Sequence, residues 1–356
     1  MINSGAILEI NTKNFLKNYK SLAKISNKSL TGATIKANAY GLGDLELFKI
    51  LYNNGCRHFF VATIDEALKI RKNYSKGNLY VLNGINENEI KLSIEKKIIP
   101  IINSTSDLKI FNNKTQNKKN KLNIGIHVDS GINRLGIKIN ELKYKKFKSL
   151  EIVILLSHLA SSDKKSSTYN NFQNKNFNSS FKFFNTTKYI SLVNSMGILL
   201  GKQFHYDLTR PGISLYGGHY NTKLKKIIKP VIKLKARVIQ IKKLKKNEFV
   251  GYNQTYKTTK PITIAILAIG YADGISRKLS NIGKVFYQKK EFNMIGRVSM
   301  DSITIDVTKY KKTIKKGIYM ELINYEYDIE KLAKKCGTIS NEILTSISNR
   351  VKRIYI

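Results

Sequence analysis

Between about residues 30 and 215, short runs of β-branched and aliphatic residues alternate with longer amphipathic stretches. This alternation predicts βαβ units and therefore a parallel sheet. Eight strand-like runs in succession indicate that the sheet closes into a (β/α)8 barrel of the TIM type. The runs are Ala33–Ala37, His58–Thr63, Asn78–Leu82, Ile98–Ile102, Leu122–Val128, Glu151–Ser157, Tyr189–Val193 and Phe204–Thr209.

After about residue 230 the pattern changes to successive strand-like runs with few helices between them. A chain of 356 residues is long enough for two domains. We therefore predict an α/β fold, with the barrel over residues 11–230 and a mostly β C-terminal domain over residues 231–356. The run Ala6–Ile10 has the character of a strand, and we expect residues 1–10 to pair with the second domain.

The formal net charge of +39 comes mostly from lysine, while arginine, which reads phosphates and base edges better, is scarce. We interpret the charge as a solvated surface and do not expect a nucleic-acid partner. No apolar run approaches the roughly 20 residues of a membrane span, and residues 1–10 lack the features of a secretory signal. Two cysteines, Cys56 and Cys336, suffice for neither a disulfide framework nor a metal cluster. We expect a cytoplasmic protein without a metal.

Polar residues follow several of the predicted strands. In a (β/α)8 barrel the active site lies where strands end and loops begin. A lysine buried at such a position is activated as a nucleophile or base, because burial disfavours its charged form. The strand ends also supply an imidazole, guanidinium groups and a potential anion site, which together predict a cofactor pocket. These residues are Lys36, Arg134, His158, Asn194, Ser195, Arg210, Gly212 and Ile213.

The segment Thr34–Gly41 resembles the lysine motif of alanine racemases, which bind pyridoxal 5'-phosphate. Other blocks along the chain resemble the same family, and they occur in the same order. Together they cover essentially the whole sequence. The blocks are Asp129–Ile137, Asn194–Ser195, Arg210–Gly217, Gly270–Gly274, Gly296–Asp301 and Thr338–Arg353.

The resemblance implies that Lys36 carries pyridoxal 5'-phosphate and that Arg210 donates to the pyridine nitrogen of the cofactor. An arginine at this place makes the ring a weaker electron sink than a carboxylate would. It further implies that the phosphate is held by Tyr40, Ser195, Gly212 and Ile213, with His158 and Asn194 also around the cofactor.

The resemblance also implies the chemistry. Lys36 and Tyr271 act as bases on opposite faces of the α-carbon, which interconverts L-alanine and D-alanine, the latter for peptidoglycan. Tyr271 reaches in from a partner subunit, so a homodimer with shared sites is expected, and His158 and Arg210 are candidates to supply the charge or donors that the phenol needs. The substrate carboxylate would be held by Arg134 and by the Met300 and Asp301 segment.

Two positions depart from the family pattern. His127 stands where many members have a lysine whose carbamylated form orients the substrate-binding arginine, so Arg134 must be positioned by hydrogen bonds or by a small anion. Asn341 stands where a tyrosine usually contacts the phosphate and narrows the entrance. This second change predicts a somewhat wider entrance and leaves open how strictly alanine is selected.

Four alternatives remain beside a strict alanine racemase. A racemase of broader specificity would accept serine and larger amino acids. A decarboxylase of basic amino acids has a similar architecture, but it typically pairs the pyridine nitrogen with a carboxylate and uses a catalytic cysteine. A single-barrel protein that only binds the cofactor would lack the second domain. A basic nucleic-acid-binding protein is suggested by net charge alone.

Overall fold

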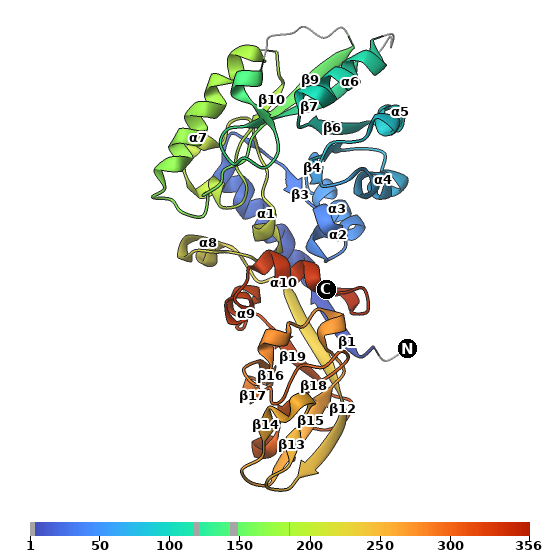
Figure 1. Cartoon of the computed structure of the whole chain (residues 1–356), viewed down its shortest axis with the longest axis vertical. Helices are drawn as coiled ribbons and strands as arrows, with labels where there is room; N and C mark the ends of the chain where they lie inside the picture. The colour runs from blue at the N-terminus through green and yellow to red at the C-terminus, as the bar shows by residue number, and fades with distance from the viewer. Residues whose placement is uncertain (1–3, 117–120, 143–148, 185) are drawn as a thin grey trace.

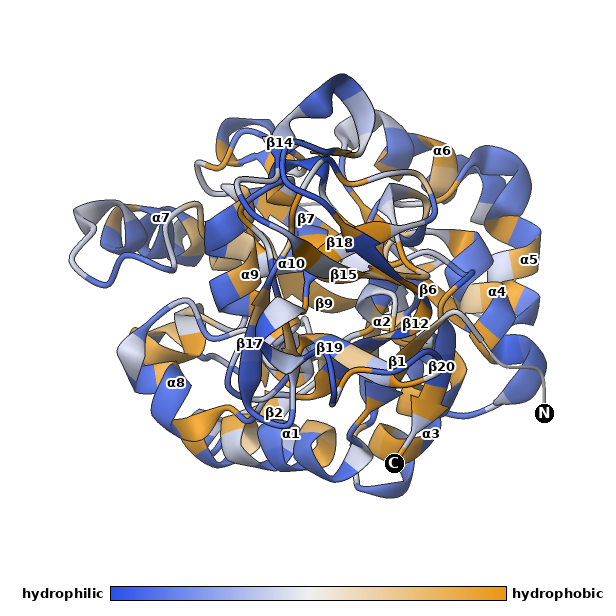
Figure 2. Ribbon diagram, turned by 90° about the horizontal axis from the view of Figure 1, so that it is seen from below, coloured by the Kyte–Doolittle hydropathy of each residue, from blue (hydrophilic) through white to orange (hydrophobic). Residues whose placement is uncertain are grey.

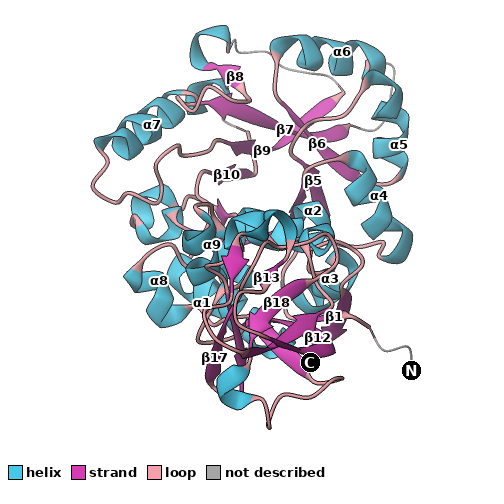
Figure 3. Cartoon of the chain, turned by 60° about the horizontal axis from the view of Figure 1, so that its bottom comes forward, coloured by secondary structure: helices cyan, strands magenta, loops and turns pink. Residues whose placement is uncertain are grey.

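The structure, a computed structural model, describes residues 4–116, 121–142, 149–184 and 186–356. An α/β domain with helices around a central sheet lies at one end of the chain's long axis, and a β-rich domain lies at the other (Figure 1). Figure 3 shows the same division by secondary structure. Of the N-terminal residues expected to pair with the second domain, residues 1–3 lie outside the described part.

The first domain is the predicted parallel barrel. Its strand order is β3-β4-β5-β6-β7-β9-β10, and β11 pairs in parallel with β2. Backbone hydrogen bonds from Asp207 to Ile190 and from Thr34 to Pro211 join the ends of this order into a ring. The strands are β2 (Leu30–Thr31), β3 (Ala33–Thr34), β4 (His58–Val61), β5 (Asn78–Val81), β6 (Ile98–Ile102), β7 (Leu122–Asp129), β9 (Leu150–Leu156), β10 (Tyr189–Ser191) and β11 (Leu208–Thr209), with the short β8 (Ile137–Lys138) beside β7.

Side chains of the barrel strands are buried on both faces, which explains why the sequence runs are continuously apolar rather than alternating. Phe60 and Tyr80 belong to an interior cluster, whereas their neighbours Phe59 and Leu79 join the larger core under the helices. Figure 2 shows the helices around the periphery of the sheet. They are α1 (Thr12–Ser26), α3 (Asp44–Asn53), α4 (Ile64–Asn73), α5 (Ile90–Glu95), α6 (Thr105–Thr115), α7 (Thr168–Ser179) and α8 (Thr222–Ile227).

Several predicted strands are shorter than expected, and two of them lose more than half of their length. The first ends at Thr34, because Ala37–Tyr40 turn into the left-handed region. The eighth is reduced to Leu208–Thr209, since Lys202–Phe204 form a 3₁₀ turn. Apolar composition does not distinguish a short buried turn from a strand, and both errors fall at strand ends.

The second domain is a sheet of mostly antiparallel strands. Its long strand β12 (Ile232–Leu244) pairs with β1 (Ala6–Ile10), and β1 also pairs in parallel with β20 (Lys352–Tyr355). Helices α9 (Ile329–Cys336) and α10 (Ser340–Ser346) lie between this sheet and the barrel (Figure 1). The other strands are β13 (Phe249–Val250), β14 (Tyr256–Lys257), β15 (Ile262–Leu267), β16 (Lys284–Tyr287), β17 (Lys290–Asn293), β18 (Ile303–Asp306) and β19 (Tyr319–Ile323).

Candidate active site

A cavity of about 720 Å³ opens at the carboxyl ends of the barrel strands. Its walls come from residues at or after the ends of β3, β7, β9, β10 and β11, and from α10 of the second domain. Parallel strands bring their carboxyl ends to one face of a barrel, so residues far apart in sequence meet there. Eleven residues singled out from the sequence line this cavity: Lys36, Tyr40, His127, Arg134, His158, Asn194, Ser195, Arg210, Gly212, Ile213 and Asn341.

Lys36 opens a left-handed turn, α2 (Lys36–Tyr40), that follows β3. The φ angles of Ala37–Tyr40 lie between 51° and 55°, a conformation that costs about 1–2 kcal/mol per non-glycine residue. The carboxylate of Glu66 accepts hydrogen bonds from the N–H groups of Ala37 at 2.6 Å and Ala62 at 2.7 Å. These bonds connect the turn to the end of β4. They stabilise the strained backbone conformation directly after Lys36.

The environment of Lys36 makes its charged form less favourable than that of an exposed lysine. Burial and the positive charge of Arg134 lower the pKa of this amine, against a smaller opposing effect of Glu66. A neutral amine is the nucleophilic form of lysine, and it is the form that can attack a carbonyl. Lys36 therefore has the electrostatic setting of a reactive amine rather than of a surface lysine.

Arg210 is a buried cation without a carboxylate partner among the described residues. Its guanidinium donates to the Ser191 hydroxyl at 2.5 Å and to the Ser157 carbonyl at 2.6 Å, and it lies over the Phe60 ring. Burial lowers the pKa of Arg210 to about 9, so the group stays charged near neutral pH. A charge left uncompensated in a cavity wall favours a ligand with an acceptor at that place.

A polar cradle lies beside the first turn. The Ser195 hydroxyl oxygen accepts hydrogen bonds from the N–H of Gly212 at 2.9 Å and of Ser214 at 3.2 Å, so its own proton is left to donate to a ligand. A Cβ at Gly212 would lie 2.5 Å from the Tyr40 hydroxyl, so the close approach of this hydroxyl requires glycine. Two hydroxyl groups and the backbone near Ile213 thus face one part of the cavity, an arrangement that fits an anionic group such as a phosphate.

The imidazole of His158 is neutral. Burial and then the charges of Arg210 and Arg134 hold its pKa well below the ordinary value. As a neutral ring, His158 can contribute a hydrogen bond but no charge, which is one of the two contributions expected of it, and its action on a phenol stays a prediction. Asn194 uses its side-chain oxygen to accept from the N–H groups of Met196 and Gly197, which fixes the turn after β10.

Tyr271, Met300 and Asp301 are not brought to the cavity within one chain. They form an exposed cluster on the second domain, where the N–H of Tyr271 donates to the Ser299 carbonyl at 3.0 Å and Asp301 pairs with Arg350. Tyr271 is 43 % exposed and Met300 is 52 % exposed. Within the described part of a single chain, Met300 therefore does not lie beside Arg134 in the cavity, where both were expected to hold the substrate carboxylate.

Comparison with known proteins identifies the family. Residues 10–220 match the family of alanine racemase N-terminal domains, and residues 231–355 match the family of alanine racemase C-terminal domains. The chain belongs to the alanine racemase family. It is 38 % identical over 356 residues to an alanine racemase of Rickettsia africae, with 98 % of each chain covered, and 36 % identical over 373 residues to that of Brucella abortus, with 99 % of this chain and 94 % of the relative covered.

Solved structures agree with this assignment. The crystal structure of an alanine racemase from Bartonella henselae, which contains covalently bound pyridoxal phosphate, superposes with a TM-score of 0.94 at 37 % identity, covering 99 % of this chain and all of the other. An alanine racemase of Clostridium difficile gives a TM-score of 0.93 at 28 % identity, covering 100 % and 97 % of the two chains. The barrel followed by a mostly β domain is thus the fold of the alanine racemase family.

Tyr220 also belongs to the site, although the sequence did not predict it. It lines the cavity with 38 % of its surface exposed, and its hydroxyl donates to the side-chain oxygen of Asn341 on α10. Its backbone, at φ 36°, is held through the carboxylate of Glu330, which accepts from the N–H of His219 at 2.9 Å and of Tyr220 at 3.4 Å. A phenol therefore stands where the loss of a tyrosine at Asn341 predicted open space.

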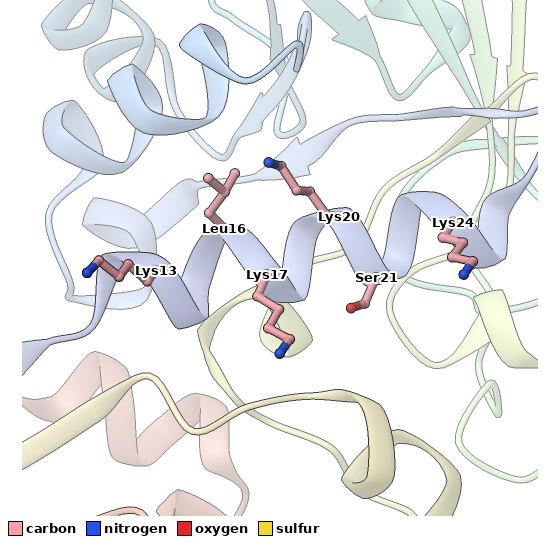
Figure 4. A pocket seen from close by; sticks show the side chains of 6 residues that line it. All are labelled: Lys13, Leu16, Lys17, Lys20, Ser21 and Lys24. Atoms are coloured by element: carbon pink, nitrogen blue, oxygen red, sulfur yellow. The ribbon is translucent and has the colours of Figure 1, made fainter.

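The positions of the cysteines bear on the decarboxylase alternative. No thiol lines the cavity, since Cys56 and Cys336 are buried elsewhere, which speaks against a decarboxylase that uses cysteine. A further hollow of about 370 Å³ lies on α1 and is lined by residues of this one helix (Figure 4): Lys13, Leu16, Lys17, Lys20, Ser21 and Lys24. The described residues include neither a helix with the length and apolarity of a membrane span nor a metal-binding group of His, Cys, Asp and Glu.

Proposed function

We propose that this chain is an alanine racemase that interconverts L-alanine and D-alanine with pyridoxal 5'-phosphate held on Lys36. The observation that carries this proposal is the half-buried Lys36 amine, whose pKa is lowered, in one cavity with the unpaired cation of Arg210 and the hydroxyl cradle of Ser195 and Tyr40. These groups fit a ligand with an aldehyde, an aromatic ring nitrogen and a phosphate. The family membership supports the same activity.

The chain's residues would divide the binding of the cofactor between them. Arg210 would donate to the ring nitrogen, and His158 would add a hydrogen bond as a neutral imidazole. When bound, pyridoxal 5'-phosphate acidifies the α-hydrogen of an amino acid attached to it by withdrawing electrons from the α-carbon. The phosphate would be held by Tyr40, Ser195, Gly212 and Ile213, with Asn194 shaping the adjoining turn.

Racemisation needs a proton removed from one face of the α-carbon and returned to the other. Lys36 Nζ would serve one face, and the hydroxyl of Tyr271 of the partner subunit would serve the opposite face. Arg134 would bind the substrate carboxylate, together with the Met300 and Asp301 segment of the partner subunit. Holding the carboxylate fixes which groups on the α-carbon face the two bases.

We infer a homodimer with shared active sites. Support comes from the exposed apolar surface of Tyr271 and Met300, which lie outside the cavity of their own chain. Gly270 could not carry a side chain, because a Cβ there would lie 2.3 Å from the carbonyl oxygens of Ser299 and Met300. The loop with Gly270 and Tyr271 is thus packed tightly against the loop with Ser299 and Met300. The two loops could enter the active site of a neighbouring subunit together. We assign the reaction to the cytoplasm, as a source of D-alanine for peptidoglycan.

The test is incubation of the cofactor-loaded protein with L-alanine in D₂O, followed by NMR. Deuterated D-alanine should form, and it should be lost in Lys36→Ala. Loss of the carboxylate instead would make the protein a decarboxylase, and absence of any α-deuterium exchange despite bound cofactor would overturn the proposal. L-serine in parallel measures whether the racemase is of the broader kind.

A further inference from the structure

His127 points into the barrel at the cavity. Side chains alternate between the two faces of a strand, and a Cβ at Gly125 of β7 would meet the interior residues Ile101 and Ile154. His127, two residues further along β7, therefore faces the interior and lines the cavity at the end of the strand. Asn103, directly after β6, follows Ile99 and Ile101 on the same side.

The partners of Asn103 fix the proton on the imidazole. The Asn103 side-chain nitrogen donates to the carbonyls of Leu82 at 3.0 Å and Ile101 at 3.2 Å, so its oxygen faces His127. This oxygen lies 2.9 Å from His127 Nδ1 and can only accept. In a neutral ring the hydrogen must then sit on Nδ1, and Nε2 presents its lone pair.

That lone pair is buried and has no partner among the described residues. His127 as a whole is only 5 % exposed. A buried acceptor without a donor is rare in native proteins, and each one calls for a ligand or a moving side chain. The acceptor belongs to the wall of the cavity and not to the packed core.

A matching donor lies in the wall of the same cavity. The guanidinium of Arg134 carries five N–H donors, and in the described part of the chain it makes neither a hydrogen bond nor an ion pair. The other guanidinium of the cavity, that of Arg210, is already bonded to Ser191 and Ser157. Lys36 and Arg210 are assigned to the cofactor, so Arg134 is the remaining cation in the cavity wall that could donate to the Nε2 acceptor.

We propose that His127 is a positioning residue whose unprotonated Nε2 accepts a hydrogen bond from Arg134 and thereby aims that guanidinium at the substrate carboxylate. The proposal rests on the proposed function for the identity of the carboxylate. It assigns to Asn103 the task of holding the imidazole in the Nδ1–H tautomer. A protonated ring would present an N–H instead and would repel Arg134.

The surroundings keep the ring neutral. Burial first, then the positive charges of Arg210 and Arg134, lower the pKa of His127 to about 3, while Asp129 opposes them. The other titratable groups in the cavity wall are Lys36, His158, Asp163, Tyr40 and Tyr220. Of these, the neutral His158 is close enough to interact with His127. The acceptor is thus present over the whole range in which the enzyme would operate.

The first measurement reads the tautomer without turnover. The holoenzyme labelled with ¹⁵N-histidine is examined by long-range ¹H–¹⁵N NMR between pH 5 and 9, and His127→Gln identifies the signal. We expect an Nδ1–H, Nε2-bare pattern throughout. An Nε2–H tautomer or an imidazolium at neutral pH would overturn the proposal.

The second measurement uses acetate, a carboxylate that the enzyme does not turn over, and its dissociation constant is obtained by NMR titration of the holoenzyme. His127→Leu and Asn103→Asp should weaken acetate binding about tenfold and raise the KM for alanine with little change in kcat, since they remove the acceptor or protonate the ring. His127→Gln should recover part of the affinity through its amide oxygen.

The control is His58→Leu. His58 is a second buried imidazole of the barrel, bonded to the Tyr80 hydroxyl at 2.9 Å and outside the cavity. The His58→Leu variant should lose stability, as His127→Leu does, but its affinity for acetate should be unchanged. Unchanged acetate binding in both His127→Leu and Asn103→Asp would refute the positioning role. Absence of alanine turnover in the unmodified protein, with the histidine effects on acetate intact, would instead refute the proposed function alone.

Discussion

The backbone N–H of Gly212 donates to the hydroxyl oxygen of Ser195 at 2.9 Å, and the N–H of Ser214 donates to the same oxygen at 3.2 Å. With its acceptor capacity used, this hydroxyl can only donate to a bound anion. Ser195→Ala should therefore weaken pyridoxal 5'-phosphate binding about tenfold, the effect of one hydrogen bond to a charged group. Equilibrium dialysis of the cofactor measures it, and Ser195→Thr, which keeps the hydroxyl, should lose less. Equal affinity in Ser195→Ala and the unmodified protein would contradict the assignment of the cradle.

The contact between Gly212 and Tyr40 predicts a pair of coupled effects. Gly212→Ala places a Cβ 2.5 Å from the Tyr40 hydroxyl, so it should displace that ring and weaken the cofactor about tenfold or more. In the Tyr40→Phe background the clashing oxygen is gone, and the added penalty of Gly212→Ala should shrink. A double-mutant cycle on cofactor affinity and on the free energy of unfolding measures the coupling. Strictly additive effects would show that the two residues do not share the cradle.

The hydrophobic pattern of the sequence predicted the strands of the barrel but not where each strand ends. Strand runs such as Ile98–Ile102 are buried on both faces, so their apolar residues mark a parallel sheet directly. Strand ends could not be predicted, because Ala37–Tyr40 enter the left-handed region through tertiary support from Glu66, twenty-nine positions from Ala37. Local preference disfavours such a turn, and no residue in it is a glycine.

The cavity residues of the barrel were predictable because each follows a strand. Tyr220 was missed since it lies beyond the last strand and reaches the cavity only through a strained backbone held by Glu330 of α9. Asn103 was missed although strand alternation along β6 placed it on the interior side; its role depends on the histidine of a neighbouring strand. The low pKa of His158 depends on its burial and on the charges of Arg210 and Arg134, which only the folded chain brings to it.

The pKa of Lys36 predicts how the cofactor attaches. Only the neutral amine reacts with an aldehyde, so attachment to the cofactor-free protein should speed up as pH rises through a pKa that lies below the ordinary value of 10.5. Arg134→Gln should shift this pH profile upward, because Arg134 lowers the pKa of Lys36, and Glu66→Gln should shift it downward, because Glu66 raises it. Stopped-flow absorbance over a pH series measures both. Shifts of the same sign in the two variants would contradict this account of the amine.

The hydrogen bond between Tyr220 and Asn341 predicts how amino acids are selected. Removing the phenol in Tyr220→Ala should raise kcat/KM for L-serine relative to L-alanine about tenfold, since the cavity mouth gains the volume of a ring. Tyr220→Phe keeps the ring and should change the ratio little. Asn341→Tyr tests the entrance from α10 and should lower the ratio. An unchanged ratio in both Tyr220→Ala and Asn341→Tyr would show that these residues do not set the size limit.

The exposure of Tyr271 outside its own chain's cavity predicts complementation between inactive subunits. Lys36→Ala and Tyr271→Ala should each be inactive as homodimers. A mixed dimer contains one site with both bases and one with neither, so after subunits are mixed equally and exchanged, about a quarter of the unmodified activity should return. Racemisation in D₂O before and after exchange measures it, and Lys36→Ala,Tyr271→Ala mixed with Lys36→Ala provides the control without a complete site. No recovery, with mixed dimers demonstrated by mass spectrometry, would show that Tyr271 does not act in the neighbouring subunit.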